Sequence, residues 1–309
     1  PPHQPTPPPP RTTQSTSRRQ RQMCIRDRNI LAKGFPLTVM AHRNRKPVED
    51  LLGKGATEDN SPRLVAENSD IVFICVSASP QVEEIVLGDG GLLEAGREGL
   101  IVVDCTTAEP SSTAKIASAL AETGAAMADA PLARTPVEAE AGRLNTMVGA
   151  APEVFAAIKP VLETFCENIF HVGELGAGHK LKLINNFLAM GHAALTAEAI
   201  VACYRTGVDP ARYYDVISAG GANSGIFQMM VPKALEGDFG GMKFGIDLAR
   251  KDLRYYRKMT EEAGLTGQMG DAVLLALAEA SNLGYGGALI ASLIEAQAKI
   301  NNQSLPHKA

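Results

Sequence analysis

The stretch IVFICVSASPQVEEIVLGDGGLLEAGREGLIVVDCTT, residues 71–107, decides the fold of this chain. It opens on a β-branched apolar run, Ile71 to Val76, and closes on a second one, Leu100 to Asp104. Between them, Gln81 to Leu87 has helical spacing. Runs that are apolar at every position suit strands covered on both faces, and such strands are typical of parallel sheets. The stretch therefore predicts a strand, a covering helix and a second, parallel strand.

The same alternation extends over residues 29–174. Further strands are predicted at Leu37 to Ala41, Ala126 to Asp129 and Thr146 to Gly149, and further helices at Val48 to Leu52, Pro110 to Thr123 and Pro152 to Phe165. Strands that alternate with helices in this way are typical of a doubly wound α/β domain, with a parallel sheet between two helical layers. We therefore expect one α/β domain over this region.

After Gly173 the pattern becomes almost wholly helical. Lys180 to Arg205 contains no proline and is apolar around most of its circumference, which is typical of a helix buried in a helical domain or between subunits. Further helices are predicted at Pro210 to Ser218, Met229 to Leu235, Phe244 to Ala263, Gln268 to Leu283 and Ala288 to Gln303. Residues 175–309 are therefore expected to form a helical domain for substrate binding and dimerisation, in a homodimer or homotetramer.

Composition limits the classes of partner. The chain has 309 residues, 45% hydrophobic and 21% charged, and a formal charge of −4, which does not favour nucleic acid or an anionic membrane. Apolar stretches such as Phe187 to Ala194 are shorter than a bilayer span, so we predict no transmembrane helix. The five cysteines have no metal-ligand spacing, so we predict no metal and a reducing, cytoplasmic location. They are Cys24, Cys75, Cys105, Cys166 and Cys203.

Residues 1–28 differ from the rest of the chain. They are dominated by proline, then by Ser, Thr and Gln, and then by arginine, with almost no apolar residue. Because such a segment buries too little apolar surface to offset the entropy lost on ordering, we expect it to be disordered. A transit peptide is an alternative that the proline tract disfavours. We expect that the segment is not native to the fold and comes from a misassembled or mistranslated 5′ end of the gene.

Polar residues follow the strands of the predicted sheet. In doubly wound sheets, ligands bind beyond the carboxyl ends of the strands, so these residues are expected to line one crevice. They are His42, Arg43, Asn44 and Arg45 after the first predicted strand, the segment Ser77 to Ser79 after the second, and Thr106 and Thr107 after the third; Val76 is the last residue of the second strand. We predict that His42, Arg43, Asn44, Arg45, Val76, Ser77 and Thr107 contact a dinucleotide.

The turn from His42 to Arg45 bears on the choice of nucleotide. An acidic residue there would bind the ribose diol of NAD, but the turn carries two guanidiniums instead. Arginine suits a 2′-phosphate through forked hydrogen bonds, so NADP is favoured and NAD is the alternative. A basic surface turn is the non-functional interpretation. Likewise, Thr106 and Thr107 are predicted to bond a ribose, to cap the helix that starts near Pro110, or to do both.

A second polar pair lies in the run Gly176-Ala-Gly-His-Lys-Leu-Lys-Leu-Ile-Asn-Asn186. Residues four apart share a helix face, so Lys182 and Asn186 are predicted to converge on one small polar molecule, with His179 on the same side. Lys180 is rotated away. The alternative is a solvated lysine and a capping asparagine.

With these motifs in view, the chain resembles the β-hydroxyacid dehydrogenase family, over about residues 29 to 303. The similar motifs, in order, are Val103 to Thr107, the loop Asp129-Ala-Pro-Leu-Ala-Arg-Thr-Pro-Val-Glu-Ala-Glu-Ala-Gly142 with Thr146 to Gly149, the GxGxxxKxxNN run of Gly176 to Asn186, and Lys251-Asp252 within Phe244 to Leu253. The resemblance implies a Rossmann-type domain followed by an all-helical domain like that of 6-phosphogluconate dehydrogenase.

The resemblance also implies an activity and site residues. Hydride would pass between NADP(H) and a small anionic β-hydroxyacid or its semialdehyde. Lys182 would exchange a proton with the substrate oxygen, provided that its pKa lies well below the usual range, and Asn186 would orient the substrate. Lys251 and Asp252 would lie near the cofactor. The loop that begins at Ala133 would hold the anionic group of the substrate.

That loop departs from the commoner family members. Ala133, Arg134 and Thr135 stand where those members carry Ser-Gly-Gly, so a guanidinium and a hydroxyl replace a backbone cradle. Sulfolactaldehyde reductases have a similar loop, which suggests a substrate with a strongly anionic end, such as a sulfonate, a phosphate or a second carboxylate. The alternative for Arg134 is a salt bridge to Glu138 or Glu140.

The N-terminal part of the sequence departs further from the family pattern. Family members open with a strand and a GxGxxG turn that binds the pyrophosphate, whereas Pro- and Arg-rich sequence stands in that place here. Residues 29–35 read as the end of the helix after that turn, so the first strand of the sheet is lacking. We expect weak dinucleotide binding and a gap between strands. The competing hypotheses are therefore a non-catalytic or cofactor-deficient binding protein on the same scaffold, and a truncated gene product.

Overall fold

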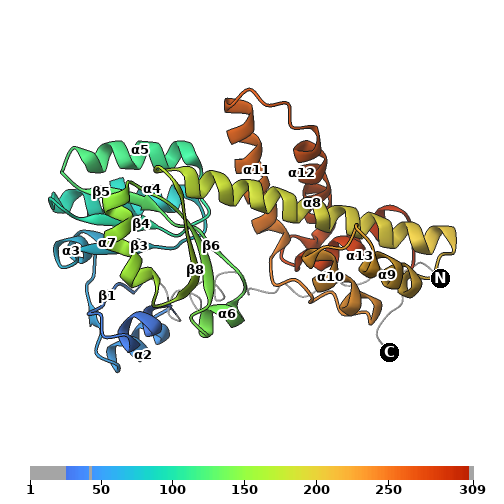
Figure 1. Ribbon diagram of the computed structural model, residues 1–309, viewed down its shortest axis with the longest axis horizontal. Helices are drawn as coiled ribbons and strands as arrows, with labels where there is room; N and C mark the ends of the chain where they lie inside the picture. The colour runs from blue at the N-terminus through green and yellow to red at the C-terminus, as the bar shows by residue number, and fades with distance from the viewer. Residues whose placement is uncertain (1–25, 42–43, 306–309) are drawn as a thin grey trace, which may run out of the picture.

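The computed structural model describes residues 26–41 and 44–305. An α/β domain and a helical domain are joined by one long helix, α8 (Ala177–Thr206), which leaves the α/β domain at its N-terminal end and runs along the helical domain (Figure 1). The last strand before it, β8 (Cys166–Gly173), belongs to the α/β domain. This arrangement confirms the predicted fold class, a parallel-rich α/β sheet followed by an all-helical domain.

Six strands form the main sheet. The order is β3-β4-β5-β7-β6, and β8 pairs with β7. The bounds are β3 (Ile71–Ile74), β4 (Ile101–Asp104), β5 (Ala126–Asp129), β6 (Leu132–Ala133) and β7 (Leu144–Gly149). Strands β3 to β5 are parallel, as predicted, but β7 runs antiparallel to β5 and β6. The short strand β6 and the strand β8 were not among the predicted strands.

Helices cover both faces of this sheet, which explains its continuous apolar runs. On β4, Val102 packs into one core cluster and Val103 into another. The neighbours on β5 behave likewise, since Met127 joins the cluster of Val102 and Ala128 that of Val103. The covering helices are α4 (Ser79–Leu87), α5 (Pro110–Ala121) and α7 (Pro152–Leu162). Because both faces are buried, neither can carry polar residues in alternation.

The expected gap lies between two sheets. Strands β1 (Thr38–Val39) and β2 (Thr57–Glu58) form a separate parallel pair, and within the described ranges no strand joins them to β3. Two short helices accompany them, α2 (Lys46–Leu52) and α3 (Pro62–Glu67). The prediction covered α2 and the region of β1 but included neither β2 nor α3.

The folded chain extends further toward the N-terminus than expected. Residues 26–32 are helical, although 26–28 were placed in the disordered segment. Arg26 is 4% exposed and its guanidinium lies 5.9 Å from the ring centroid of Phe165, while Arg28 pairs with Asp50 at 2.7 Å. Arg26 and Arg28 therefore have specific partners in the α/β domain, and the expectation of disorder is wrong for residues 26–28. Residues 1–25 lie outside the described part.

The helical domain packs around α8. Its other helices are α9 (Pro210–Ala219), α10 (Gly225–Leu235), α11 (Ile246–Glu262), α12 (Gln268–Ala280) and α13 (Leu293–Ile300). Residues from α8, α11 and α12 meet in one core, for example Met190, Leu253 and Leu277. The last predicted helix began too early, because the N–H of Ile290 donates to the carbonyl of Phe244 at 2.8 Å and Gly245 bridges Leu289, which holds that segment extended.

Helix α8 also bears on the membrane question. Among the described residues it is the one helix long and apolar enough to cross a membrane by length and composition, and it is longer than the stretches on which the prediction was based. It contacts β7 and helices α10 to α13, as the core helix of a globular domain would. Its outer face nevertheless exposes four large apolar side chains, Leu181, Ile184, Leu188 and Leu195.

Candidate active site

The start of α8 is fixed by β5. Gly176 has φ +88° and provides no side-chain cap, so the carboxylate of Asp129 accepts its N–H at 2.6 Å instead. Gly178 lies so close to β7 that a Cβ there would overlap the carbonyl oxygen of Met147. The two glycines of the motif therefore allow the helix to begin directly on the sheet.

Lys182 and Asn186 share one face, at the spacing the sequence predicted. They are 8% and 7% exposed, so the interpretation as a solvated lysine and a capping asparagine is wrong. Asn186 Nδ2 donates to Asp252 Oδ2 at 2.8 Å, and Asp252 on α11 is 2% exposed. Two distant segments of the sequence thus meet in one buried polar group.

The environment of Lys182 favours the neutral amine. Burial is the main cause that lowers its pKa from the usual range, and the ammonium of Lys251 acts in the same direction. The carboxylate of Asp252 opposes both effects. A lysine in such a position can exchange a proton nearer to neutral pH than an exposed lysine can.

Lys251 joins this group to the α/β domain. Its Nζ lies 2.8 Å from Asp252 Oδ1 and donates to the carbonyl of Thr107 at 2.7 Å. The same Nζ is 4.7 Å from the ring centroid of Tyr255. The structure therefore brings three predicted cofactor residues, Thr107, Lys251 and Asp252, to Asn186.

The turns after β3 and β4 lie side by side. The N–H of Val76 donates to Thr106 Oγ1 at 3.1 Å, and the N–H of Ser77 donates to Gln81 Oε1 at 2.8 Å. Thr106 is fully buried, so its hydroxyl connects the two turns and is not available to a ribose. Thr107 is partly exposed and remains available to a ligand.

The turn after β1 is described only in part, because His42 and Arg43 lie outside the described residues. Asn44 Oδ1 accepts the N–H of Lys46 at 3.3 Å, at the start of α2. The guanidinium of Arg45 donates two hydrogen bonds to the carboxylate of Glu58, with distances of 3.0 and 2.9 Å. Its guanidinium is therefore engaged by β2, and a 2′-phosphate would have to share it.

The loop after β6 is anchored within the α/β domain. Arg134 has φ +81°, a strained value for a side-chain-bearing residue. Its guanidinium donates to the carbonyl of Arg143 at 2.7 Å and pairs with Glu167, so neither Glu138 nor Glu140 is its partner.

Thr135 is used differently from Arg134, since it caps α6 (Pro136–Glu140) in a capping box with Glu138. Ala133 pairs with Asn145 in β7, near the end of the strand where Leu144 pairs with Cys166. Helix α8 contacts the other half of β7, at Met147 and Gly149. Among the described residues no hydrogen bond joins this loop to Lys182, and its substrate-binding role stays a prediction.

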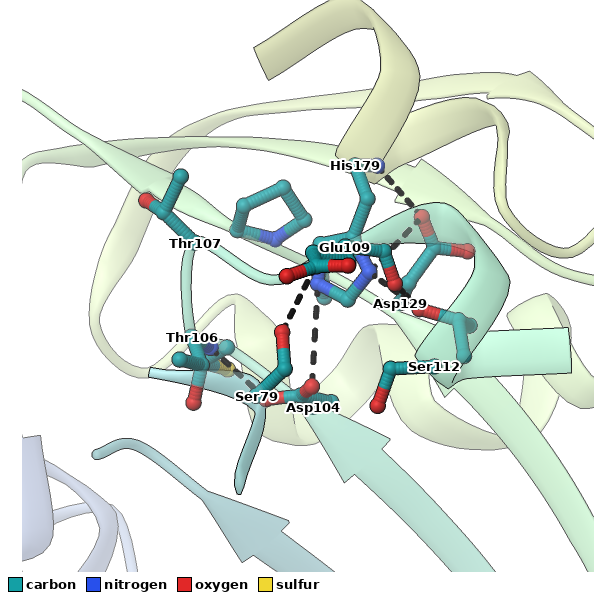
Figure 2. Close-up of polar contacts among 12 residues, drawn as sticks. Ser79, Asp104, Thr106, Thr107, Glu109, Ser112, Asp129 and His179 are labelled. Carbon is teal, nitrogen blue, oxygen red and sulfur yellow. Dashed lines mark hydrogen bonds and ion pairs between the residues drawn. The ribbon is translucent and has the colours of Figure 1, made fainter. Parts of the chain in front are cut away.

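Sequence reasoning missed a buried polar network beneath α8. It includes Asp104 and Asp129, which end β4 and β5, and the ring of His179 (Figure 2). These three residues are at most 1% exposed. The available signal was an acidic residue closing each of two apolar strands, because a carboxylate there must find a buried partner.

Comparison with known proteins gives the family. Residues 26–173 match the NAD binding domain of 6-phosphogluconate dehydrogenase, and residues 176–296 match the NAD-binding domain of NADP-dependent 3-hydroxyisobutyrate dehydrogenase. The chain is 37% identical to 2-(hydroxymethyl)glutarate dehydrogenase of Eubacterium barkeri over 207 residues, which are 67% of this chain and 68% of the relative.

Two further likenesses agree. The chain is 31% identical to 3-sulfolactaldehyde reductase of Escherichia coli, over 73% of this chain and 75% of the relative. The crystal structure of a 3-hydroxyisobutyrate dehydrogenase from Salmonella typhimurium superimposes with a TM-score of 0.76 at 26% identity, covering 89% of this chain and 96% of that one. With the lysine and asparagine of α8 in place beside α11, this chain belongs to the β-hydroxyacid dehydrogenase family of NAD(P)-dependent oxidoreductases.

Proposed function

We propose that this protein interconverts a small anionic β-hydroxyacid and its semialdehyde by hydride transfer with NADP(H). The observation that carries the proposal is the buried Lys182, which shares a helix face with Asn186 and has the Asp252–Lys251 pair beside it. In the reducing direction, Lys182 gives a proton to the developing alkoxide. In the oxidising direction, its neutral amine removes that proton.

The nicotinamide nucleotide supplies or accepts the hydride when it is bound. The turns after β3 and β4 fit its nicotinamide end, since Thr107 and Ser77 are partly exposed and Lys251 bonds the Thr107 carbonyl. Asn186 orients the substrate without titrating. For the adenosine end, the two guanidiniums of Arg43 and Arg45 support NADP over NAD, although Glu58 already engages Arg45.

We propose a dianionic substrate with Arg134 as the residue that recognises its second acidic group. Two observations support this. Arg134 already binds one carboxylate, that of Glu167, which a substrate anion would replace. In addition, 2-(hydroxymethyl)glutarate, named in the relative at 37% identity, is a dicarboxylate.

The test is a steady-state assay of NADPH consumption with monoanionic and dianionic semialdehydes. We expect Arg134→Ala to raise KM for dianionic substrates by about 10- to 100-fold, the effect of one charge-assisted hydrogen bond, with a much smaller change for monoanions. Arg143→Ala is the matched control. Equal losses for both substrate classes would contradict the role of Arg134, and no turnover with any semialdehyde would contradict the function.

A homodimer is also proposed. The exposed stripe of Leu181, Ile184, Leu188 and Leu195 repeats at three to seven residues along α8, which is the spacing of one helix face. Large apolar side chains in a row on a globular domain mark an interaction surface. A second copy of the chain is the occupant that we propose.

A second candidate is a binding protein without turnover. The separation of the β1–β2 pair from the main sheet favours it, because a dinucleotide of this fold spans both halves. Titration of the intact protein with NADPH, followed by nicotinamide fluorescence, separates the two candidates. Saturable binding of NADPH supports the dehydrogenase. An intact fold that does not bind NADPH supports the cofactor-deficient binding protein.

A further inference from the structure

The first turn of α8 is held by groups that the roles of Lys182 and Asn186 leave unexplained. Asp129 accepts the N–H of Gly176 at 2.6 Å and that of His179 at 2.5 Å, so both of its oxygens face the helix start. A carboxylate at a helix N-terminus is also favoured by the helix dipole. The position of this turn is thus set from β5.

The ring of His179 turns down into the α/β domain, where it is fully buried. Its Nδ1 lies 2.7 Å from Thr113 Oγ1, and that hydroxyl lies 3.2 Å from the carbonyl oxygen of Glu109. Either atom of the His179–Thr113 pair can be the donor, and in both cases the bond ties the first turn of α8 to α5.

Two buried carboxylates flank the ring. Asp104 Oδ2 is 3.8 Å from Nε2, and Asp129 Oδ2 is 3.8 Å from Nδ1 (Figure 2). Within the described residues, Nε2 has no hydrogen-bond partner. The ring therefore lies between the ends of β4 and β5, with Nε2 toward one buried carboxylate and Nδ1 toward the other.

The same network reaches the cofactor turns. Asp104 Oδ1 accepts the N–H of Thr106 at 2.8 Å, and Thr106 Oγ1 accepts the N–H of Val76 at 3.1 Å. His179 precedes Lys182 by about one turn of α8. One continuous set of contacts therefore runs from the turns that follow β3 and β4 to the helix that carries the lysine.

We propose that His179 is a positioning residue for Lys182: its buried ring, held by Thr113 between Asp104 and Asp129, fixes the first turn of α8 against the carboxyl ends of β4 and β5. This inference rests on the proposed dehydrogenase function. His179 touches neither substrate nor nucleotide, so its removal should change kcat and leave nucleotide binding almost unchanged. A small displacement of a catalytic group is sufficient for a large loss of rate.

The kinetic test compares His179→Gln and His179→Ala with His192→Gln, a control on the same helix. Glutamine keeps an amide that can hydrogen-bond Thr113 but lacks the ring, whereas alanine lacks both. We expect kcat to fall about 10-fold in His179→Gln and about 100-fold in His179→Ala, with KM for NADPH within about twofold of the parent. His192→Gln should match the parent.

The second readout is independent of turnover. Titration of the lysine side chains by ¹⁵N NMR should place the pKa of Lys182 below the usual lysine range in the parent. In His179→Ala, loosening of the turn admits water to the amine, so the pKa of Lys182 should rise toward the usual lysine range. The carboxylate of Asp252 and the ammonium of Lys251 are the charged groups beside Lys182, and both remain in every variant.

The outcomes separate the two proposals. If the parent shows no dehydrogenase activity, the proposed function fails, but the NMR titration still decides the role of His179. An unchanged Lys182 titration together with unchanged kcat in His179→Ala would overturn the inference. If that variant does not fold, the same two measurements on His179→Gln decide.

Discussion

At the scale of single residues, Lys182 combines a charge with a nearly complete loss of solvent. Burial depresses its pKa, so the folded protein favours the neutral amine more than the unfolded chain does. The sign follows for stability: below the folded pKa the buried ammonium destabilises the fold, and this penalty disappears as pH rises toward the unfolded value. Removal of the charge should therefore stabilise the protein.

We predict that Lys182→Met loses at least about 100-fold in kcat while its free energy of unfolding rises by about 1 kcal/mol near neutral pH. Lys180→Met is the matched control, because Lys180 is exposed on the same helix and should change neither quantity. Activity assays and thermal unfolding give both numbers. In the parent, as pH rises through the pKa of Lys182, kcat for aldehyde reduction should fall and kcat for alcohol oxidation should rise. Equal profiles in both directions would exclude it as the proton donor.

Some contacts of the candidate site could be predicted from the sequence, and others could not. The spacing of Lys182 and Asn186 lies within one helix, so their common face could be predicted. The two hydrogen bonds from Arg45 to Glu58 join two segments that meet only in the tertiary structure, and no periodicity of the sequence relates these two residues. The same holds for Arg134 and Glu167, where a nearby acid was the natural expectation and the partner came from β8.

At the scale of elements, α8 has two faces with different tasks. One face buries Lys182 and Asn186, and the other exposes Leu188 and Leu195, which are 58% and 60% accessible. Exposure on this scale is unfavourable for a lone domain and is relieved when a second copy covers the stripe.

We predict that Leu188→Glu combined with Leu195→Glu converts the protein from a dimer to a monomer in light scattering after size exclusion. Because both side chains already face solvent in the single chain, the monomer should keep its helical circular dichroism. Val216→Glu on α9 is the control, since Val216 is 69% exposed outside the stripe and should leave the dimer intact. A parent that is monomeric at all concentrations would contradict the proposed interface.

Elements that are long or apolar throughout were predictable, and short ones were not. Strands β3 to β5 stand out because burial on both faces demands apolar residues along them, up to the closing Asp104 and Asp129. Strand β2 has two residues, one of them exposed, so its sequence carries no such pattern. Strand β7 was predicted in part as well, but a strand-like sequence does not encode direction, and its antiparallel pairing to β5 and β6 follows from the connections.

At the scale of the whole molecule, the gap in the sheet divides the α/β domain into two parts, the main sheet and the β1–β2 pair, and the main sheet is held by more packing and pairing. Strand β4 has paired neighbours on both sides and lies between two core clusters. The β1–β2 pair rests on a small cluster whose buried members are Val39, Val48, Leu51 and Ala56. An isolated two-stranded sheet is only marginally stable, so this part should open without unfolding of the rest.

Native-state hydrogen exchange tests this directly. The amides of Thr57 and Asp59, which donate to the carbonyls of Leu37 and Val39, should exchange through openings that cost several kcal/mol less than those of Val102 and Val103 in β4. If NADPH bridges the two parts, saturating nucleotide should slow exchange at Thr57 and Asp59 while leaving the β4 amides unchanged. Equal protection of both sheets without nucleotide would show that the β1–β2 pair is as firmly held as β4, and that the gap between the sheets carries no cost in stability.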